Sequence, residues 1–185
     1  MPSFTEKHAD IWGDNPQQLM KEYDYQSELT EQLDVLNPDN FDREKLYEIV
    51  LWKLNRFPQI EDTLLDKIRD LSSLTSMSHR KSETVLKELL SCHGIRLPMA
   101  STILRFINPN VFQIIDDRVF RVLSLEGKMP AKPPKIHERY LQKCCDIYFN
   151  YLDELHKVCD TSLPFEESDR ILYLLDIKLG NKIGD

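Results

Sequence analysis

Residues 83–123 read ETVLKELLSCHGIRLPMASTILRFINPNVFQIIDDRVFRVL, and this stretch decides the fold. Apolar side chains recur at helical spacing on both sides of a short connection over 93–97. We therefore predict one helix over 83–92 and a second over 98–107. Pro98 suits the first position of the second helix, because proline lacks the N–H group that would have no partner there.

The pattern changes after the second helix. Residues 111–115 form a short apolar run that is typical of extended backbone. Asp116 or Asp117 then opens another helix through Leu123, because an aspartate at a helix start accepts hydrogen bonds from the first-turn amides. Capping is the ordinary role of such a residue, and a carboxylate held in this way can also face a cleft.

The connection between the two helices has the features of a phosphate-binding turn. A tight turn before a helix N-terminus exposes backbone N–H groups, which bind a phosphate oxygen without a cationic side chain. Residues 94–99 would supply these groups. The surrounding stretch is also more basic than the chain as a whole, through Arg96, Arg105, Arg118, Arg121, Lys128 and Lys132.

On these residues the chain resembles the helix-hairpin-helix (HhH-GPD) DNA glycosylases, in particular the endonuclease III and adenine-glycosylase branches. Members carry a hairpin of the form LPGVGRxTA followed by a segment like VDTHIFRV, and this chain has HGIRLPMAS followed by IIDDRVFRV. Gly94 falls on the first hairpin glycine, Ile95 on the apolar residue and Arg96 on the second glycine. Asp116 follows Pro98 by 18 residues, the separation expected in that branch.

The resemblance implies a reaction and a catalytic residue. Asp116 falls on the essential aspartate, and Asp117 is the runner-up because the alkylpurine branch carries paired acids there. Pro98 stands where bifunctional members have a Schiff-base lysine. The implied activity is therefore base excision repair by a monofunctional hydrolase, which cleaves the N-glycosidic bond of a flipped base. It implies no metal and no cofactor, and its partner is double-stranded DNA with a damaged or modified base.

The resemblance also implies where DNA would bind. The early helix pair of the family encloses a turn that enters the duplex, and residues 55–57 occupy that turn here. Residues 171–174 correspond to a closing helix beneath the cleft. The implied DNA-binding residues are Gly94, Ile95, Arg96, Pro98, Arg118, Asn55 and Arg56.

The rest of the chain is helical by pattern, so the expected fold class is all-α, a two-lobed HhH-GPD DNA-glycosylase-like fold. Further helices are predicted over 16–36, 41–55, 60–74, 136–158 and 165–177. We expect residues 1–185 to form a single domain of two helical lobes. A central lobe over about 40–125 would carry the hairpin, and residues 1–39 with 126–185 would form the second lobe.

Composition limits the class of protein. The chain has 24 Lys+Arg against 31 Asp+Glu, a net charge of −7, which argues against a highly basic nucleic-acid coat. No run approaches the ~18 apolar residues of a membrane span, and the polar start lacks a signal-peptide core. The spacing of the four cysteines favours reduced thiols. We expect a cytoplasmic monomer that does not bind membranes.

The acidic balance and Arg96 leave a second interpretation open. Arginine at a position where the family has glycine can alter the hairpin geometry, because glycine adopts backbone angles that other residues resist. The alternative is a catalytically inactive module of the same fold that binds nucleic acid or a protein partner.

Overall fold

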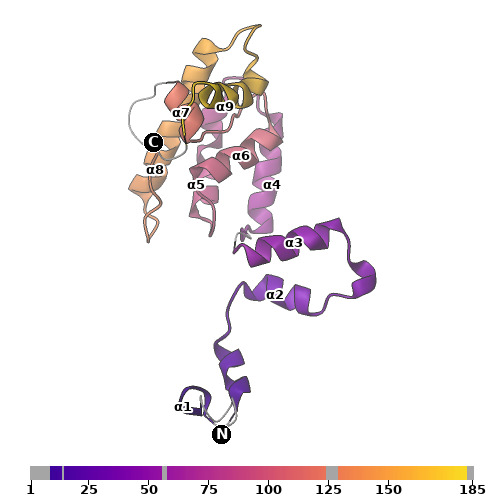
Figure 1. Ribbon diagram of the computed structural model, residues 1–185. Helices are drawn as coiled ribbons and strands as arrows, with labels where there is room; N and C mark the ends of the chain where they lie inside the picture. Colours follow the sequence, from indigo (N-terminus) through magenta and orange to yellow (C-terminus); the bar gives the residue numbers. More distant parts are fainter. Residues whose placement is uncertain (1–8, 14, 56–57, 124–128, 183–185) are drawn as a thin grey trace. The chain divides into compact units, whose positions relative to one another are not determined.

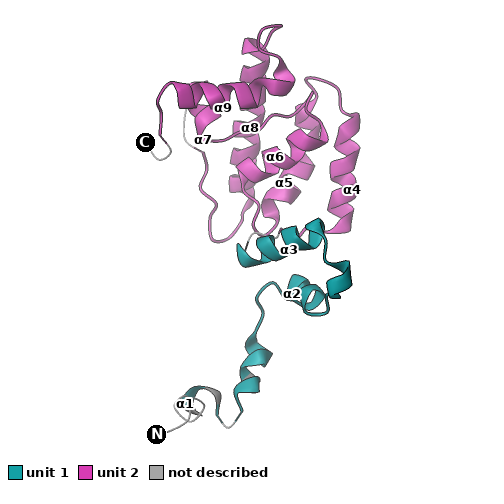
Figure 2. Ribbon diagram, turned by 45° about the vertical axis from the view of Figure 1, so that its right-hand side comes forward, with its two compact units in different colours: residues 1–57 teal, residues 58–185 magenta. Residues whose placement is uncertain are grey.

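The computed structural model describes residues 9–13, 15–55, 58–123 and 129–182, and within these ranges every regular element is a helix (Figure 1). The all-α class predicted from the sequence is confirmed. The chain divides into two compact units, residues 1–57 and residues 58–185 (Figure 2). The lobe limits near 40 and 125 stay a prediction. Across the described ranges, no helix combines the length and the apolar character needed to cross a membrane.

The first unit contains short helices. They are α1 (Ala9–Trp12), a 3-10 helix (Pro16–Glu22), α2 (Ser27–Asp34), a 3-10 helix (Pro38–Asn40) and α3 (Arg43–Lys53). The continuous helix predicted over 16–36 is wrong. The backbone becomes extended at Tyr23, and Gln26 has a φ of 45°, a left-handed conformation that cannot continue a right-handed helix.

Trp52 holds α3 against α2 in this unit. Its indole Nε1 donates to Thr30 Oγ1 at 2.8 Å, and its ring meets the ring of Tyr25 edge to face at 5.2 Å. Its backbone carbonyl accepts a hydrogen bond from the Tyr25 hydroxyl at 2.9 Å. Trp52 is therefore a packing residue inside the first unit.

The second unit is built around α8 (Glu138–Val158), which buries side chains at helical spacing from Tyr140 to Leu155. Helices α5 (Glu83–Ser91) and α6 (Leu97–Ile107) pack on α8 and together form the predicted hairpin. The other helices of this unit are α4 (Asp62–Asp70), α7 (Asp117–Val122) and α9 (Ser168–Lys178). Short 3-10 helices cover Leu71–Ser73, His79–Ser82 and Phe165–Glu167.

Helix α9 attaches to α7 through a buried carboxylate. Both oxygens of Asp176 accept hydrogen bonds from Arg121, at 3.0 and 2.9 Å, and Arg118 Nη1 donates to Oδ2 at 2.7 Å. Asn181 Nδ2 donates to Oδ1 at 2.8 Å. The side chain of Asp176 is fully buried. The hydrogen bonds from Arg121, with those of Asn181 and Arg118, hold the pKa of this carboxyl well below its ordinary value of 3.8.

Replacement of Asp176 with asparagine should destabilise the protein at neutral pH. The variant removes the buried negative charge that pairs with Arg118 and Arg121, and removal of one partner of a buried pair is strongly destabilising. We expect the melting temperature at pH 7 to fall by about 10 °C. The exposed Asp66→Asn, which removes a carboxylate paired with Arg69, is the matched control and should change it little.

The same variant has a defined pH dependence. Because the folded-state pKa of Asp176 is depressed, its contribution to stability is present above the unfolded pKa and is lost as pH falls below it. The difference in melting temperature between wild type and Asp176→Asn should therefore shrink between about pH 5 and pH 3. Scanning calorimetry of both proteins across this range measures the difference. A difference that stays constant with pH would contradict a depressed pKa for Asp176.

Candidate active site around Asp116

Asp116 is the N-cap of α7, as the sequence predicts for one of the two aspartates. Its backbone is extended, with φ −137° and ψ 177°, and its Oδ1 accepts hydrogen bonds from the amides of Arg118 and Val119 at 3.0 and 2.9 Å. Among the described residues, nothing donates to Oδ2. Asp117 is the exposed first residue of α7. Asp116 therefore has one oxygen engaged in capping and a second available for other chemistry.

A cavity of about 410 Å³ lies beside this carboxylate. One wall comes from the residues that lead into α7 and the other from α9. Most of its lining is apolar or aromatic, and it also contains two carboxylates and one arginine. The lining residues are Ile114, Asp116, Val119, Asp169, Arg170, Tyr173 and Leu174.

Two tyrosines of α8 hold the passage over residues 113–115, which leads to Asp116. Tyr148 donates its hydroxyl hydrogen to the carbonyl of Gln113 at 3.0 Å, and Tyr151 donates to the carbonyl of Ile114 at 2.6 Å. Burial raises the pKa of both phenols well above the ordinary value of 10.0. The hydroxyls therefore remain protonated, and donate, throughout the neutral pH range.

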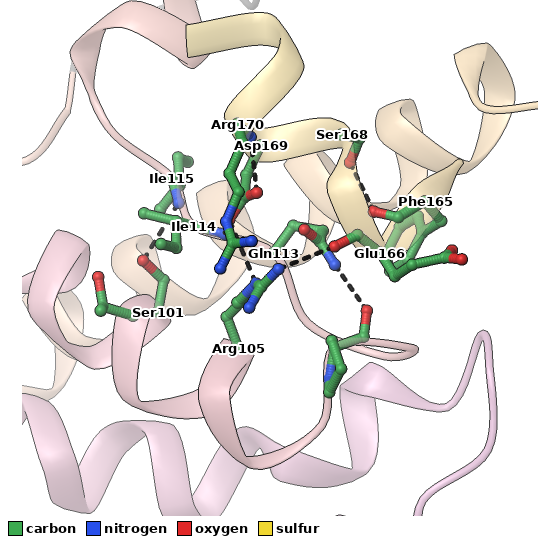
Figure 3. Close-up of polar contacts among 12 residues, drawn as sticks. Ser101, Arg105, Gln113, Ile114, Ile115, Phe165, Glu166, Ser168, Asp169 and Arg170 are labelled. Carbon is green, nitrogen blue, oxygen red and sulfur yellow. Dashed lines mark hydrogen bonds and ion pairs between the residues drawn. The ribbon is translucent and has the colours of Figure 1, made fainter. Parts of the chain in front are cut away.

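Side chains also satisfy the amides of this passage (Figure 3). The N–H of Ile114 donates to Asp169 Oδ2 at 3.3 Å, and the N–H of Ile115 donates to Ser101 Oγ at 3.1 Å. The Ser101 hydroxyl in turn donates to the carbonyl of Pro98 at 2.8 Å. This last pair of bonds connects the residue next to Asp116 with the first turn of α6, where the hairpin ends.

The second carboxylate of the cavity, Asp169, is paired with an arginine of α6. Asp169 is 3% exposed, and Arg105 Nε lies 3.6 Å from its Oδ2. Its Oδ1 accepts a hydrogen bond from the amide of Arg170 at 2.6 Å, and Arg105 Nη2 donates to the carbonyl of Glu166 at 2.9 Å (Figure 3). The buried arginine therefore compensates the charge of Asp169 and links α6 to the start of α9.

The hairpin has the backbone that its sequence requires. Gly94 has a φ of +78°, in the left-handed region that favours glycine, and Ile95 is fully buried. Arg96 is exposed and extended, with φ −116° and ψ 171°, so arginine introduces no strain where the family has glycine. Pro98 is the exposed second residue of α6 rather than the first.

The start of α6 presents backbone donors. The first hydrogen bond of the helix runs from the Ala100 amide to the Arg96 carbonyl at 2.9 Å. The amides of Leu97 and Met99 precede it and have no carbonyl of their own helix to pair with, and Pro98 has no N–H group. Leu97 is buried and Met99 is exposed, and the binding of a phosphate at this turn stays a prediction.

The other predicted DNA-binding residues do not belong to the hairpin. Arg118 is bound to Asp176 and stacks over the ring of Tyr173, 5.4 Å from its centroid. Asn55 belongs to the first unit, has a φ of 51°, and its Oδ1 accepts a hydrogen bond from Gln26 Nε2 at 3.1 Å. Arg56 and Phe57 lie outside the described residues. Only the hairpin, Asp116, Asp117 and Arg118 are therefore placed together in one unit.

Sequence analysis did not identify the residues that hold the passage. No sequence motif marks these residues, because the groups that they bind lie 14 to 64 positions away along the chain. They are Ser101, Tyr148, Tyr151 and the Arg105–Asp169 pair. The only signal was the position of Asp169 in an acidic first helical turn. Tyr173 and Leu174 lie in the predicted closing segment, and both line the cavity.

Comparison of the chain with family models, curated proteins and solved structures gave no match. The site is therefore interpreted from its own geometry. Within the described ranges, no three or more His, Cys, Asp or Glu side chains are grouped so that they could hold a metal ion.

Two substitutions at Asp116 should separate its capping role from its charge. Asp116→Ala removes the acceptor of two amides and should lower the free energy of unfolding by about 1 kcal/mol. Asp116→Asn retains a side-chain oxygen that caps a helix about as well, so its stability should stay within about 0.5 kcal/mol of wild type. Urea denaturation measures both variants. Asp117→Asn is the control, and equal losses in the Ala and Asn variants would contradict the capping geometry.

Proposed function

We propose that the protein is a monofunctional DNA glycosylase of the helix-hairpin-helix type, which hydrolyses the N-glycosidic bond of a damaged or modified base. The observation that carries the proposal is the placement of Asp116. Its carboxylate is fixed through one oxygen, borders a cavity of about 410 Å³, and follows a passage bonded to the helix that ends the hairpin.

The chemistry follows from this arrangement. Cleavage of an N-glycosidic bond develops positive charge on the sugar, and a fixed carboxylate stabilises that charge. Asp116 Oδ2 would orient the attacking water and accept its proton. The water oxygen bonds to the sugar carbon, and the base leaves with the bonding electron pair and acquires a proton. The flipped base would occupy the cavity, where Tyr173 and Leu174 offer apolar contact.

The hairpin determines which products form. Pro98 has no amine at the position where a Schiff base would form, so the expected product is an intact strand with an abasic site. The backbone amides at the start of α6 would hold a phosphate of that strand. Because these donors are uncharged, local binding is compatible with a net charge of −7.

A second candidate is a binding module of the same fold without catalysis. The observation that favours it is the internal use of charged groups near the site. Asp116 is already engaged as a helix cap, and both Arg118 and Arg121 bind Asp176. Such a module would hold DNA through the hairpin and release no base.

The test is base release from duplex oligonucleotides that carry a panel of lesions, with alkali cleavage of the abasic sites formed. Wild type should release one class of base without cutting the strand before alkali treatment. Asp116→Asn, with its fold intact, should be slower by a factor of about 10² to 10⁴. Asp117→Asn should retain activity.

The other outcomes are equally informative. Unchanged activity in Asp116→Asn would overturn the catalytic role of this residue. DNA binding without base release from any lesion would select the non-catalytic module. Absence of binding to every nucleic acid tested would overturn both candidates.

A further inference from the structure

Lys132 makes an unusual contact with the hairpin. It lies in the proline-rich connection before α8, and its Nζ donates to the carbonyls of Cys92 and Ile95 at 3.0 and 2.9 Å. These carbonyls flank the left-handed Gly94 and lie 40 and 37 positions away along the chain. The ammonium group therefore closes the hairpin turn from outside it.

The contact uses only part of the capacity of the ammonium group. A lysine has three N–H donors, and the two carbonyls occupy two of them. The described residues supply no acceptor for the third. Lys132 is half-buried, so this donor and the positive charge remain within reach of a ligand at the hairpin surface.

The position of this charge matters for binding an anion. The Cys92 carbonyl lies at the C-terminal end of α5, where the helix dipole is negative, and would repel a phosphate. The ammonium group offsets that charge. Ile95 directly precedes Arg96, the N-cap of α6, so the positive charge lies next to the first amides of that helix. An approaching anion would meet these amides together with a fixed cation.

We propose that Lys132 is a positioning residue of the hairpin that also attracts the phosphodiester backbone of DNA. The inference rests on the proposed nucleic-acid binding and adds a specific residue to it. Lys132 holds the carbonyls of the turn in place, and its charge compensates the phosphate. Lys135 provides a matched comparison, because it lies on the same connection, is exposed, and makes no hydrogen bond with the described residues.

The experiment compares Lys132→Met, Lys132→Arg and Lys135→Met in the full chain. The probe is a DNA duplex with one stable abasic analogue, and the dissociation constant is measured at several salt concentrations. Loss of a cation that compensates one phosphate should reduce the slope of log affinity against log salt by about 1. Between 50 and 200 mM salt, the affinity of Lys132→Met should therefore fall by a factor roughly four times smaller than the factor by which the wild-type affinity falls.

The two control variants sharpen this comparison. Lys135→Met should keep the wild-type slope, because its charge is not fixed at the hairpin. Lys132→Arg retains the charge and should recover most of the slope. Equal slopes in wild type and Lys132→Met would overturn the proposed phosphate contact.

A second measurement tests the turn without DNA. The Ile95 amide donates to the Cys92 carbonyl at 3.4 Å, and its hydrogen exchange reports whether the turn is closed. Exchange should be faster in Lys132→Met and unchanged in Lys135→Met. Faster exchange with an unchanged salt slope would assign Lys132 a structural role only and overturn the inference. Failure of wild type to bind the probe would instead overturn the proposed function, whatever the exchange shows.

Discussion

The hydrogen bonds that side chains make to the backbone of residues 113–115 position the whole candidate site. This passage belongs to no helix or strand, so its buried backbone groups must find their partners elsewhere. Tyr148 and Tyr151 supply the donors, and Ser101 and Asp169 supply the acceptors. Because these four side chains come from α6, α8 and α9, the place of Asp116 depends on all three helices.

Two buried carboxylates of α9 complete this arrangement. Asp169 pairs with Arg105 of α6 near the start of the helix, and Asp176 pairs with Arg118 and Arg121 of α7 near its end. Each carboxylate would be costly to bury alone, and each is compensated by arginine. The two sets of partners fix both ends of the helix that forms one wall of the cavity.

The parts of the site that depend on local sequence were predictable. The apolar face of α5, the glycine in the turn and the aspartate at the start of α7 follow from helical spacing and backbone preference. The partners of the passage were not predictable, because tertiary packing selects them. The helical spacing of Tyr148 in the sequence would be the same whether or not its hydroxyl donates to the Gln113 carbonyl. The helix predicted over 16–36 failed since Gln26 adopts a left-handed conformation that its residue type does not reveal.

The attachment of α9 has a consequence for the dynamics of the cavity. Among the described residues of this helix, Leu172 is the one buried apolar side chain, and Ser168, Asp169 and Asp176 are its buried polar residues. A segment held by ion pairs and hydrogen bonds, with little apolar burial, belongs to the less stable end of a folded structure. The two carboxylate–arginine sets therefore decide how firmly this wall of the cavity is held, because one buried apolar side chain cannot replace them.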